Sequence, residues 1–313
     1  MTRALVFPGQ GSQAVGMGRE LAEAFAAARH TLEEVDEALK QKLSKLMFDG
    51  PESDLILTEN AQPALMAVSL AVVRVLEREG GLDLRRHAAF VAGHSLGEYS
   101  ALCAAGAFAL ADTARLLKRR GLAMQRAVPV GAGAMAALLG LEIDAAREVA
   151  ELAAEGEVCA AANDNGPGQV VVSGDKAAVE RAVKLAAERG ARRAIMLPVS
   201  APFHCSLMAP AASEMEEALS AISISAPAVP VIANITAGAV EDPDTIRRLL
   251  VEQVTGLVRW RESVLYMKQQ GVHIVVELGA GRVLTGLVKR IDRDLAASSV
   301  GTPGEIEAFL KTL

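Results

Sequence analysis

The sequence predicts an α/β fold, because short apolar segments of strand length alternate along the chain with longer segments of helical periodicity. Two of the apolar segments, residues 4–7 and 88–92, each lead into a glycine-containing turn, as expected for buried strands of a largely parallel sheet. Residues 133–199 follow the order strand, helix, strand, strand, helix, strand, which is typical of a ferredoxin-like unit. The expected organisation is an α/β body over residues 1–128 and 199–313, with a ferredoxin-like subdomain inserted over residues 129–198.

The first half of the body has clear end signals for its elements. Pro8-Gly9 ends the first strand, Gly80-Gly81 ends a strongly periodic helix, and Asp112 is predicted as the N-cap of the last helix. The predicted elements are a strand at 4–7, helices at 16–46 and 62–79, a strand at 88–92, a helix from Leu96 and a helix over 112–128.

The insert and the second half of the body continue the alternation. Asn163-Asp164-Asn165-Gly166 contains an Asn-Gly pair, which favours a hairpin turn between the two middle strands of the insert. The insert is predicted to contain strands at 134–139, 158–162, 169–173 and 194–197 and helices at 143–154 and 177–189. The elements that follow are a helix at 207–222, a strand at 229–233, helices at 244–254 and 260–270, a strand at 273–277 and a final helix from Gly281.

Composition excludes several classes of protein. The 313 residues are 51% hydrophobic and 22% charged, which is too apolar for a disordered chain. The net charge is −6 and only 3% of the residues are aromatic, so we expect no nucleic-acid partner. No apolar run reaches the ~18 residues that span a bilayer, and the N-terminus lacks the apolar stretch of a signal peptide. We therefore expect a cytoplasmic protein with no membrane association.

The cysteines indicate neither a disulfide framework nor a metal site. There are three, Cys103, Cys159 and Cys205, and none forms a C-x-x-C pair. No other cluster of residues has the spacing of metal ligands. The sequence therefore predicts neither a bound metal nor a redox cofactor.

Gly93-His94-Ser95-Leu96-Gly97 matches the G-x-S-x-G pattern of a nucleophile elbow, with a predicted strand before it and a helix after it. The flanking glycines permit the tight turn and the close approach of neighbouring elements. The turn lifts the Ser95 hydroxyl to the N-terminus of a helix, which favours developing negative charge. Ser95 is therefore the candidate nucleophile, and an ordinary glycine-rich turn is the alternative.

A serine nucleophile needs a base to accept its proton. His204 lies in the proline-containing loop 198–205, and loops fixed by a rigid scaffold commonly carry catalytic groups. His204 is therefore the candidate base for Ser95. The other histidines are His30 and His87, which lie in polar surroundings, His94, which points away from the hydroxyl within the elbow, and His273, which begins a strand.

For two further segments the residues alone do not decide between a functional and a purely structural role. Pro8-Gly9-Gln10-Gly11-Ser12-Gln13 is a second glycine-rich loop after a strand, and its N–H groups could meet an oxyanion or a phosphate. It has neither the P-loop nor the dinucleotide pattern, and a plain turn explains it as well. Lys118-Arg119-Arg120 is a charge run of the kind that usually marks a solvated helix face.

Together these segments resemble the malonyl-CoA:acyl carrier protein transacylase family, and the resemblance extends along nearly all of the chain. The family fold is an α/β-hydrolase-like body with a ferredoxin-like insert, in agreement with the predicted order of elements. The segments that carry the resemblance are residues 7–13, 93–99, 120–121, 124–125 and 202–204, followed by Gln253, residues 277–279 and residues 283–284.

The resemblance implies a two-step acyl transfer in which malonyl-CoA is the substrate and CoA is a product. Ser95 attacks the thioester, while His204 accepts the serine proton and later protonates the leaving thiolate. The phosphopantetheine thiol of acyl carrier protein then takes the malonyl group and regenerates Ser95. The resemblance implies no cofactor.

The resemblance also implies roles for other residues of the site. The backbone N–H groups of Gln10 and Leu96 hold the oxyanion, and a carbonyl at Gln253 orients the histidine in place of a carboxylate. Arg120, alone of its charge run, binds the malonyl carboxylate through its planar fork. Phe203 resembles the residue of malonyl-selective rather than methylmalonyl-selective acyltransferases.

Acyl carrier proteins are strongly acidic, so a chain with a net charge of −6 needs a local basic surface to bind one. Two clusters are candidates, and scattered solvated charges are an equally good explanation of both. The clusters are Arg181, Lys184, Arg189, Arg192 and Arg193 on the insert, and Lys289, Arg290 and Arg293 on the last predicted helix. The enzyme is predicted to be a monomer.

Three other functions share part of this pattern. A serine hydrolase or thioesterase uses the same elbow but passes the acyl group to water instead of a carrier thiol. An acyltransferase of polyketide assembly shares the motifs, and the residues do not separate it from the expected role in fatty acid synthesis. A carrier-protein-binding module with a dead site would lack Ser95 or His204, and both are present.

Overall fold

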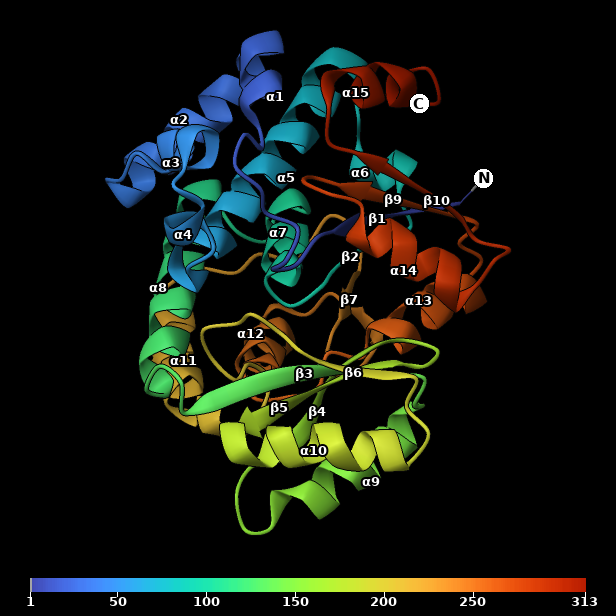
Figure 1. The fold of residues 1–313 in the computed structure, drawn as a ribbon. Helices are drawn as coiled ribbons and strands as arrows, with labels where there is room; N and C mark the ends of the chain where they lie inside the picture. Colours follow the sequence, from blue (N-terminus) through green and yellow to red (C-terminus); the bar gives the residue numbers. More distant parts are fainter. Residues whose placement is uncertain (1) are drawn as a thin grey trace.

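The computed structural model describes residues 2–313 and contains two separate sheets (Figure 1). The larger sheet has the strand order β10-β9-β1-β2-β7-β8, and its neighbouring strands are parallel except for β7 and β8. The predicted α/β fold class is therefore confirmed. The strands of this sheet are β1 (Arg3–Phe7), β2 (Phe90–Gly93), β7 (Val231–Ala233), β8 (Gly238–Val240), β9 (Ile274–Leu278) and β10 (Ala296–Val300).

Most of the predicted helices of the body are present, but the prediction of one continuous helix over 16–46 is wrong. The chain forms three helices there, because Phe25 is extended and Lys40 is left-handed with a φ of 50°. The helices of the body are α1 (Arg19–Ala24), α2 (Ala26–Leu39), α3 (Leu43–Asp49), α4 (Glu52–Leu55), α5 (Thr58–Gly80), α6 (Leu84–His87), α7 (Leu96–Ala104), α8 (Leu110–Ala127), α11 (Ala209–Ser220), α12 (Pro243–Gln253), α13 (Trp260–Gln269), α14 (Val283–Ile291) and α15 (Pro303–Leu310), with a 3-10 turn η1 at Ser206–Met208.

Two other predictions about the body are also wrong. The helix that Asp112 is predicted to cap begins at Leu110, so Asp112 lies in its first turn and pairs with Arg115 at 2.9 Å. The helix predicted from Gly281 is not final, because β10 and α15 follow it. The apolar pattern misses β10 because this edge strand buries only Val300. None of the helices within residues 2–313 is long and apolar enough to cross a membrane.

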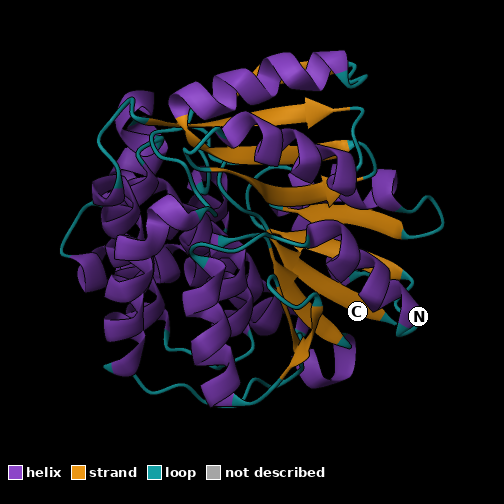
Figure 2. Cartoon of the chain, turned by 90° about the horizontal axis from the view of Figure 1, so that it is seen from below, coloured by secondary structure: helices purple, strands orange, loops and turns teal. Residues whose placement is uncertain are grey.

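The central strand β1 builds a core on each of its faces. Leu5 and Phe7 pack into a core with α5 and α7, while Ala4 and Val6 pack into a second core with α13 and α14. Figure 2 shows helices on both sides of the strands. Because both faces are covered, the ends of the parallel strands are where side chains from different loops can meet at an open edge.

The insert forms the second sheet, whose antiparallel strands have the order β4-β5-β3-β6, with α9 and α10 packed against it. The predicted order of its elements is confirmed, and the domain limits at 128 and 199 stay a prediction. The elements are β3 (Gly133–Leu139), α9 (Ile143–Ala154), β4 (Cys159–Gly166), β5 (Gln169–Asp175), α10 (Lys176–Glu188) and β6 (Arg193–Met196).

The hairpin turn predicted at Asn163-Asp164-Asn165-Gly166 is wrong. Strand β4 continues through these residues, and the turn lies at Pro167-Gly168. The body holds the longer strand in place: the Asp164 carboxylate pairs with Arg261 at 2.9 Å, and its backbone N–H donates to the Val258 carbonyl at 2.9 Å. A contact between the insert and the body therefore overrides the local preference of Asn-Gly for a turn.

Candidate active site

The turn between β2 and α7 holds Ser95 in a strained conformation. Its φ of 53° and ψ of −111° are rare for a residue with a side chain. Glycines make the turn possible: a Cβ on Gly93 would lie 1.9 Å from the Gly97 carbonyl carbon, and one on Gly97 would lie 2.2 Å from the Phe7 carbonyl oxygen. The strand–turn–helix context predicted for the elbow is therefore confirmed.

Ser95, His204 and Gln253 form one chain of hydrogen bonds. The Oγ of Ser95 lies 2.8 Å from Nε2 of His204, and Nδ1 of His204 lies 2.9 Å from the Gln253 carbonyl oxygen. Because a carbonyl oxygen can only accept, Nδ1 carries the proton and Nε2 accepts the Ser95 hydroxyl. The structure thus brings the predicted nucleophile, base and orienting residue together.

Burial keeps the His204 imidazole neutral. Its pKa is lowered to about 3, first by burial and second by the charge of Arg120, while the hydrogen bond to the Gln253 carbonyl opposes the shift. A neutral imidazole is the form that can accept a proton from serine. The other histidine of the elbow, His94, points elsewhere as predicted, because its Nε2 lies 2.8 Å from Oδ1 of Asn165 in β4.

The Arg120 guanidinium lies beside the nucleophile and is 1% exposed. One terminal nitrogen donates to Gln62 Oε1 at 2.8 Å, and the other donates to Gln253 Oε1 at 2.9 Å and to Ser95 Oγ at 3.1 Å. Within residues 2–313 no carboxylate forms an ion pair with it, and burial lowers its pKa. Of its charge run, Lys118 pairs instead with Glu59 and Arg119 with Glu214 and Glu217.

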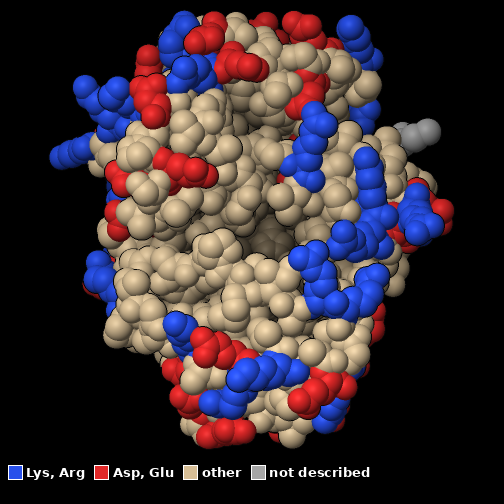
Figure 3. Space-filling view, in the orientation of Figure 1, with Lys and Arg blue, Asp and Glu red and all other residues tan. Residues whose placement is uncertain are grey.

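A cavity of about 540 Å³ opens over Ser95, His204 and Arg120. Gln10 and Leu96, the residues predicted to hold the oxyanion, both line it, as does Phe203. Leu96 is the first residue of α7, where backbone N–H groups have no acceptor within the helix. Figure 3 shows the hollow at the centre of the molecular face, between the body and the insert.

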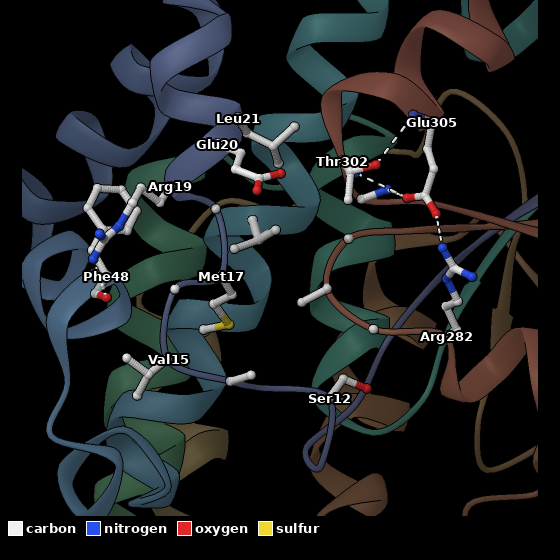
Figure 4. Close-up of a pocket in the computed structure, with 18 residues that line it drawn as sticks. Ser12, Val15, Met17, Arg19, Glu20, Leu21, Phe48, Arg282, Thr302 and Glu305 are labelled. Carbon is white, nitrogen blue, oxygen red and sulfur yellow. Dashed lines mark hydrogen bonds and ion pairs between the residues drawn. The ribbon is translucent and has the colours of Figure 1, made fainter.

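A second cavity of about 620 Å³ lies between α1 and the C-terminal segment that leads into α15 (Figure 4). Three of its four charged lining side chains form ion pairs, and Glu20 forms none among the described residues. Arg282 pairs with Glu305 at 2.6 Å, and Glu305 also takes part in the capping box of Thr302. Arg19 donates to Asp49 at 2.8 Å. No serine–histidine pair lies here among the described residues, so the cavity over Ser95 is the candidate active site.

Comparison with known proteins agrees with this geometry. The acyl transferase domain family matches residues 4–302. The malonyl CoA-acyl carrier protein transacylase of Bacillus subtilis (strain 168) is 46% identical over 311 residues, which are 99% of this chain and 96% of the relative. The chain belongs to the malonyl CoA-acyl carrier protein transacylase family. The predicted family resemblance is confirmed.

Solved structures of this transacylase family have the same fold. The acyl-carrier-protein-S-malonyltransferase from Bartonella henselae is 56% identical, with a TM-score of 0.97 and coverage of 100% of this chain and 99% of the other. A malonyl-transacylase in complex with a type II polyketide synthase acyl-carrier protein is 42% identical, with a TM-score of 0.97 and full coverage of both chains.

The sequence prediction missed three residues of this transacylase site. Gln62 holds Arg120, as described above. Asn234 Oδ1 accepts from the Ser95 backbone N–H at 2.7 Å, and Asn234 Nδ2 donates to the Gly93 carbonyl at 2.7 Å. The third residue is Glu98, whose contacts are described below. Asn234 follows the end of β7, and polar residues in that position at the edge of a parallel sheet are a usable signal.

Proposed function

We propose that this chain transfers the malonyl group from malonyl-CoA to the phosphopantetheine thiol of acyl carrier protein, through a malonyl-Ser95 intermediate, and so supplies fatty acid synthesis. The observation that carries the proposal is that the Ser95 hydroxyl contacts both a neutral imidazole and a buried guanidinium. The first can activate the serine, and the second can hold a carboxylate of the substrate. A cytoplasmic location and a monomeric state follow from the sequence and stay predictions.

In the first step the Ser95 oxygen attacks the thioester carbonyl of malonyl-CoA, and its proton passes to His204 Nε2. The backbone N–H groups of Gln10 and Leu96 donate to the oxyanion of the tetrahedral intermediate. When the carbon–sulfur bond breaks, His204 returns the proton to the CoA thiolate. The Gln253 carbonyl keeps Nδ1 protonated throughout. A neutral carbonyl stabilises the imidazolium less than a carboxylate would, and the thioester tolerates this because a thiolate is a good leaving group.

In the second step the thiol of acyl carrier protein repeats the reaction in reverse. His204 takes the thiol proton, the sulfur attacks malonyl-Ser95, and the serine oxygen leaves with the proton. Throughout both steps Arg120 holds the malonyl carboxylate, which supplies the negative partner missing from the free protein. A carboxylate beside Arg120 also offsets the charge that lowers the pKa of His204.

Mass spectrometry of the intact protein tests the proposed function. Mixing with malonyl-CoA is expected to add one malonyl group, which maps to Ser95, and adding the phosphopantetheine form of acyl carrier protein is expected to move that group to the carrier. If the adduct is lost to water at the same rate with and without the carrier, the chain is a thioesterase. If no adduct forms, the proposal is wrong.

The polyketide alternative is favoured by one observation, the structural match to a transacylase bound to a type II polyketide synthase carrier protein. Comparing transfer to a fatty acid carrier and to a polyketide carrier separates the two roles. A markedly higher kcat/KM with the fatty acid carrier supports the role proposed above, and the reverse order supports polyketide assembly.

The low pKa of His204 predicts a flat pH dependence for modification of Ser95. The imidazole protonates only near its pKa of about 3, so it stays neutral as the pH falls from about 8 to about 5. The rate constant for labelling Ser95 with an uncharged fluorophosphonate is therefore expected to change little over this range. A half-maximal rate near the ordinary histidine value of about 6.5 would contradict the burial argument.

Ion pairs within the chain favour some of the candidate carrier-binding side chains over others. Arg181 pairs with Glu155 and Glu157, and Arg189 pairs with Glu148, so these side chains are occupied within the insert. By contrast, Lys and Arg gather beside the central hollow over α14 and the neighbouring end of β6 (Figure 3). Lys184, Arg192, Arg193, Lys289, Arg290 and Arg293 make no ion pair with the described residues.

Charge reversal tests this surface. The double variant Lys289→Glu/Arg290→Glu is expected to raise the KM for acyl carrier protein about 10-fold, because it replaces attraction to an acidic partner with repulsion. Hydrolysis of malonyl-CoA in the absence of the carrier should not change. Arg181→Glu, on the occupied cluster, is the matched control with an unchanged KM. An equal effect on carrier transfer and on hydrolysis would show that these residues of α14 do not bind the carrier.

A further inference from the structure

Glu98 is a buried carboxyl group next to the reactive residues, and the proposed reaction does not use it. It lies in the first turn of α7, three residues after Ser95, and is 3% exposed. Burying an ionisable group is costly unless it is hydrogen-bonded. One oxygen, Oε2, accepts from the Asn234 backbone N–H at 3.0 Å and from Gln253 Nε2 at 2.8 Å.

The two residues that Glu98 holds also hold the rest of the site. Gln253 positions His204 through its carbonyl oxygen and Arg120 through its side-chain oxygen, and its Nε2 donates to the Ser95 carbonyl at 3.1 Å. Asn234 accepts from the Ser95 N–H through its side chain. Ser95, His204 and Arg120 are therefore each one residue away from Glu98 Oε2 in this hydrogen-bond network. The residue between them is Gln253 or, for Ser95, also Asn234.

We propose that Glu98 is the positioning residue of this site: its Oε2 fixes Gln253 and Asn234, and through them it sets the mutual geometry of Ser95, His204 and Arg120. The proposal rests on the proposed function of those three residues. Without the shared acceptor, Gln253 Nε2 keeps only the longer hydrogen bonds to the Ser95 carbonyl at 3.1 Å and to Asn234 Oδ1 at 3.5 Å. The side chain is then held less firmly, so the guanidinium can shift relative to the hydroxyl. Glu98 thereby couples recognition of the malonyl carboxylate to activation of the serine.

The role of Glu98 is that of an acceptor rather than a fixed charge. Burial raises its pKa to about 7, while the Asn234 and Gln253 hydrogen bonds and the charge of Arg120 oppose the shift. The other titratable group that interacts with it is Tyr99, whose pKa is raised to about 12, first by burial. Both protonation states of Glu98 are populated near neutral pH, and each retains an oxygen that accepts hydrogen bonds.

Three substitutions separate acceptor, reach and charge. Glu98→Gln keeps the side-chain length and an accepting oxygen but loses the charge. Glu98→Asp keeps the charge, but its side chain is one methylene shorter. Glu98→Ala removes the accepting oxygen and the charge. We expect kcat for malonyl transfer in the order wild type ≈ Gln > Asp > Ala, with the alanine variant about 10- to 100-fold below wild type. The preference for malonyl-CoA over acetyl-CoA and the rate of fluorophosphonate labelling of Ser95 are expected to fall in the same order.

A second buried glutamate supplies the matched control. Glu277 is fully buried and accepts from the Leu284 and Thr285 backbone N–H groups, away from the cavity. Glu277→Ala is expected to lower the melting temperature but to leave kcat and acyl preference unchanged per folded molecule. This control separates a positioning role from a general loss of stability.

The outcomes distinguish this inference from the proposed function. If wild type transfers malonyl groups but the folded aspartate variant matches it in kcat, labelling and acyl preference, Glu98 has no positioning role. If the aspartate variant is active and the glutamine variant is not, the charge acts instead of the acceptor, and the proposal is overturned. If wild type transfers no malonyl group, the proposed function itself is wrong, while fluorophosphonate labelling still reports on Glu98.

Discussion

Replacing Ser95 with alanine is expected to lower malonyl transfer roughly 10⁶-fold, because the covalent intermediate can no longer form. The hydroxyl is the only group that His204 Nε2 contacts within hydrogen-bond distance in the described chain, at 2.8 Å. Intact-mass measurement with malonyl-CoA should show no adduct, and a radioactive transfer assay should show no malonyl-carrier product. Binding of malonyl-CoA is expected to persist, since Arg120 and the cavity remain.

Ser100→Ala is the matched control for this prediction. Ser100 lies in α7, the helix that begins directly after Ser95, is fully buried and has no hydrogen-bond partner for its hydroxyl among residues 2–313. Removing that hydroxyl should leave kcat within a few-fold of wild type. A malonyl adduct that survives in Ser95→Ala would show that another side chain is the nucleophile.

The second large effect is expected from Arg120→Ala, which should lower the preference for malonyl-CoA over acetyl-CoA about 10²- to 10⁴-fold. In the wild type an acetyl group leaves a buried guanidinium without a negative partner, whereas a malonyl group supplies one. Alanine removes the guanidinium, so the penalty against acetyl disappears together with the gain for malonyl. The measurement is kcat/KM for both thioesters with one carrier protein.

Two further variants define the cause of that change. Arg120→Lys keeps the charge but loses the planar fork, so it is expected to recover only part of the preference. Arg119→Ala, on the same helix, removes a half-exposed side chain that pairs with Glu214 and Glu217, and it should leave the preference unchanged. A malonyl preference that is unaltered in Arg120→Ala would refute carboxylate binding by this residue.

The sequence predicted correctly those elements whose forming signals all lie within one short segment. The helix predicted at 143–154 has the bounds observed for α9, because its apolar periodicity and its ends lie within one short segment. The elbow is predictable for the same reason, since Gly93 and Gly97 occupy positions where any side chain would collide with the backbone. The G-x-S-x-G pattern then places Ser95 at the centre of that turn.

Local signals failed where a distant contact outweighed them. The Asn-Gly pair near Asp164 favours a turn, but Arg261 and Val258 hold that segment in β4. The apolar periodicity over 16–46 continues across Phe25 and Lys40, although the backbone leaves the helix at both. Edge strand β10 escaped prediction because it buries little apolar surface.

The amino-acid order by itself determined the α/β alternation, the turn that carries the serine and the candidate pairing of Ser95 with His204. Only the tertiary structure showed that Gln62, Asn234 and Glu98 complete the site. Each of these residues acts through a partner far away in the chain, and a hydrogen bond between distant segments leaves no periodicity in the sequence. The position of Asn234 directly after a strand is the one signal that the sequence carries for these three residues. Their roles exist because folding removes water from these polar groups and forces them to satisfy one another.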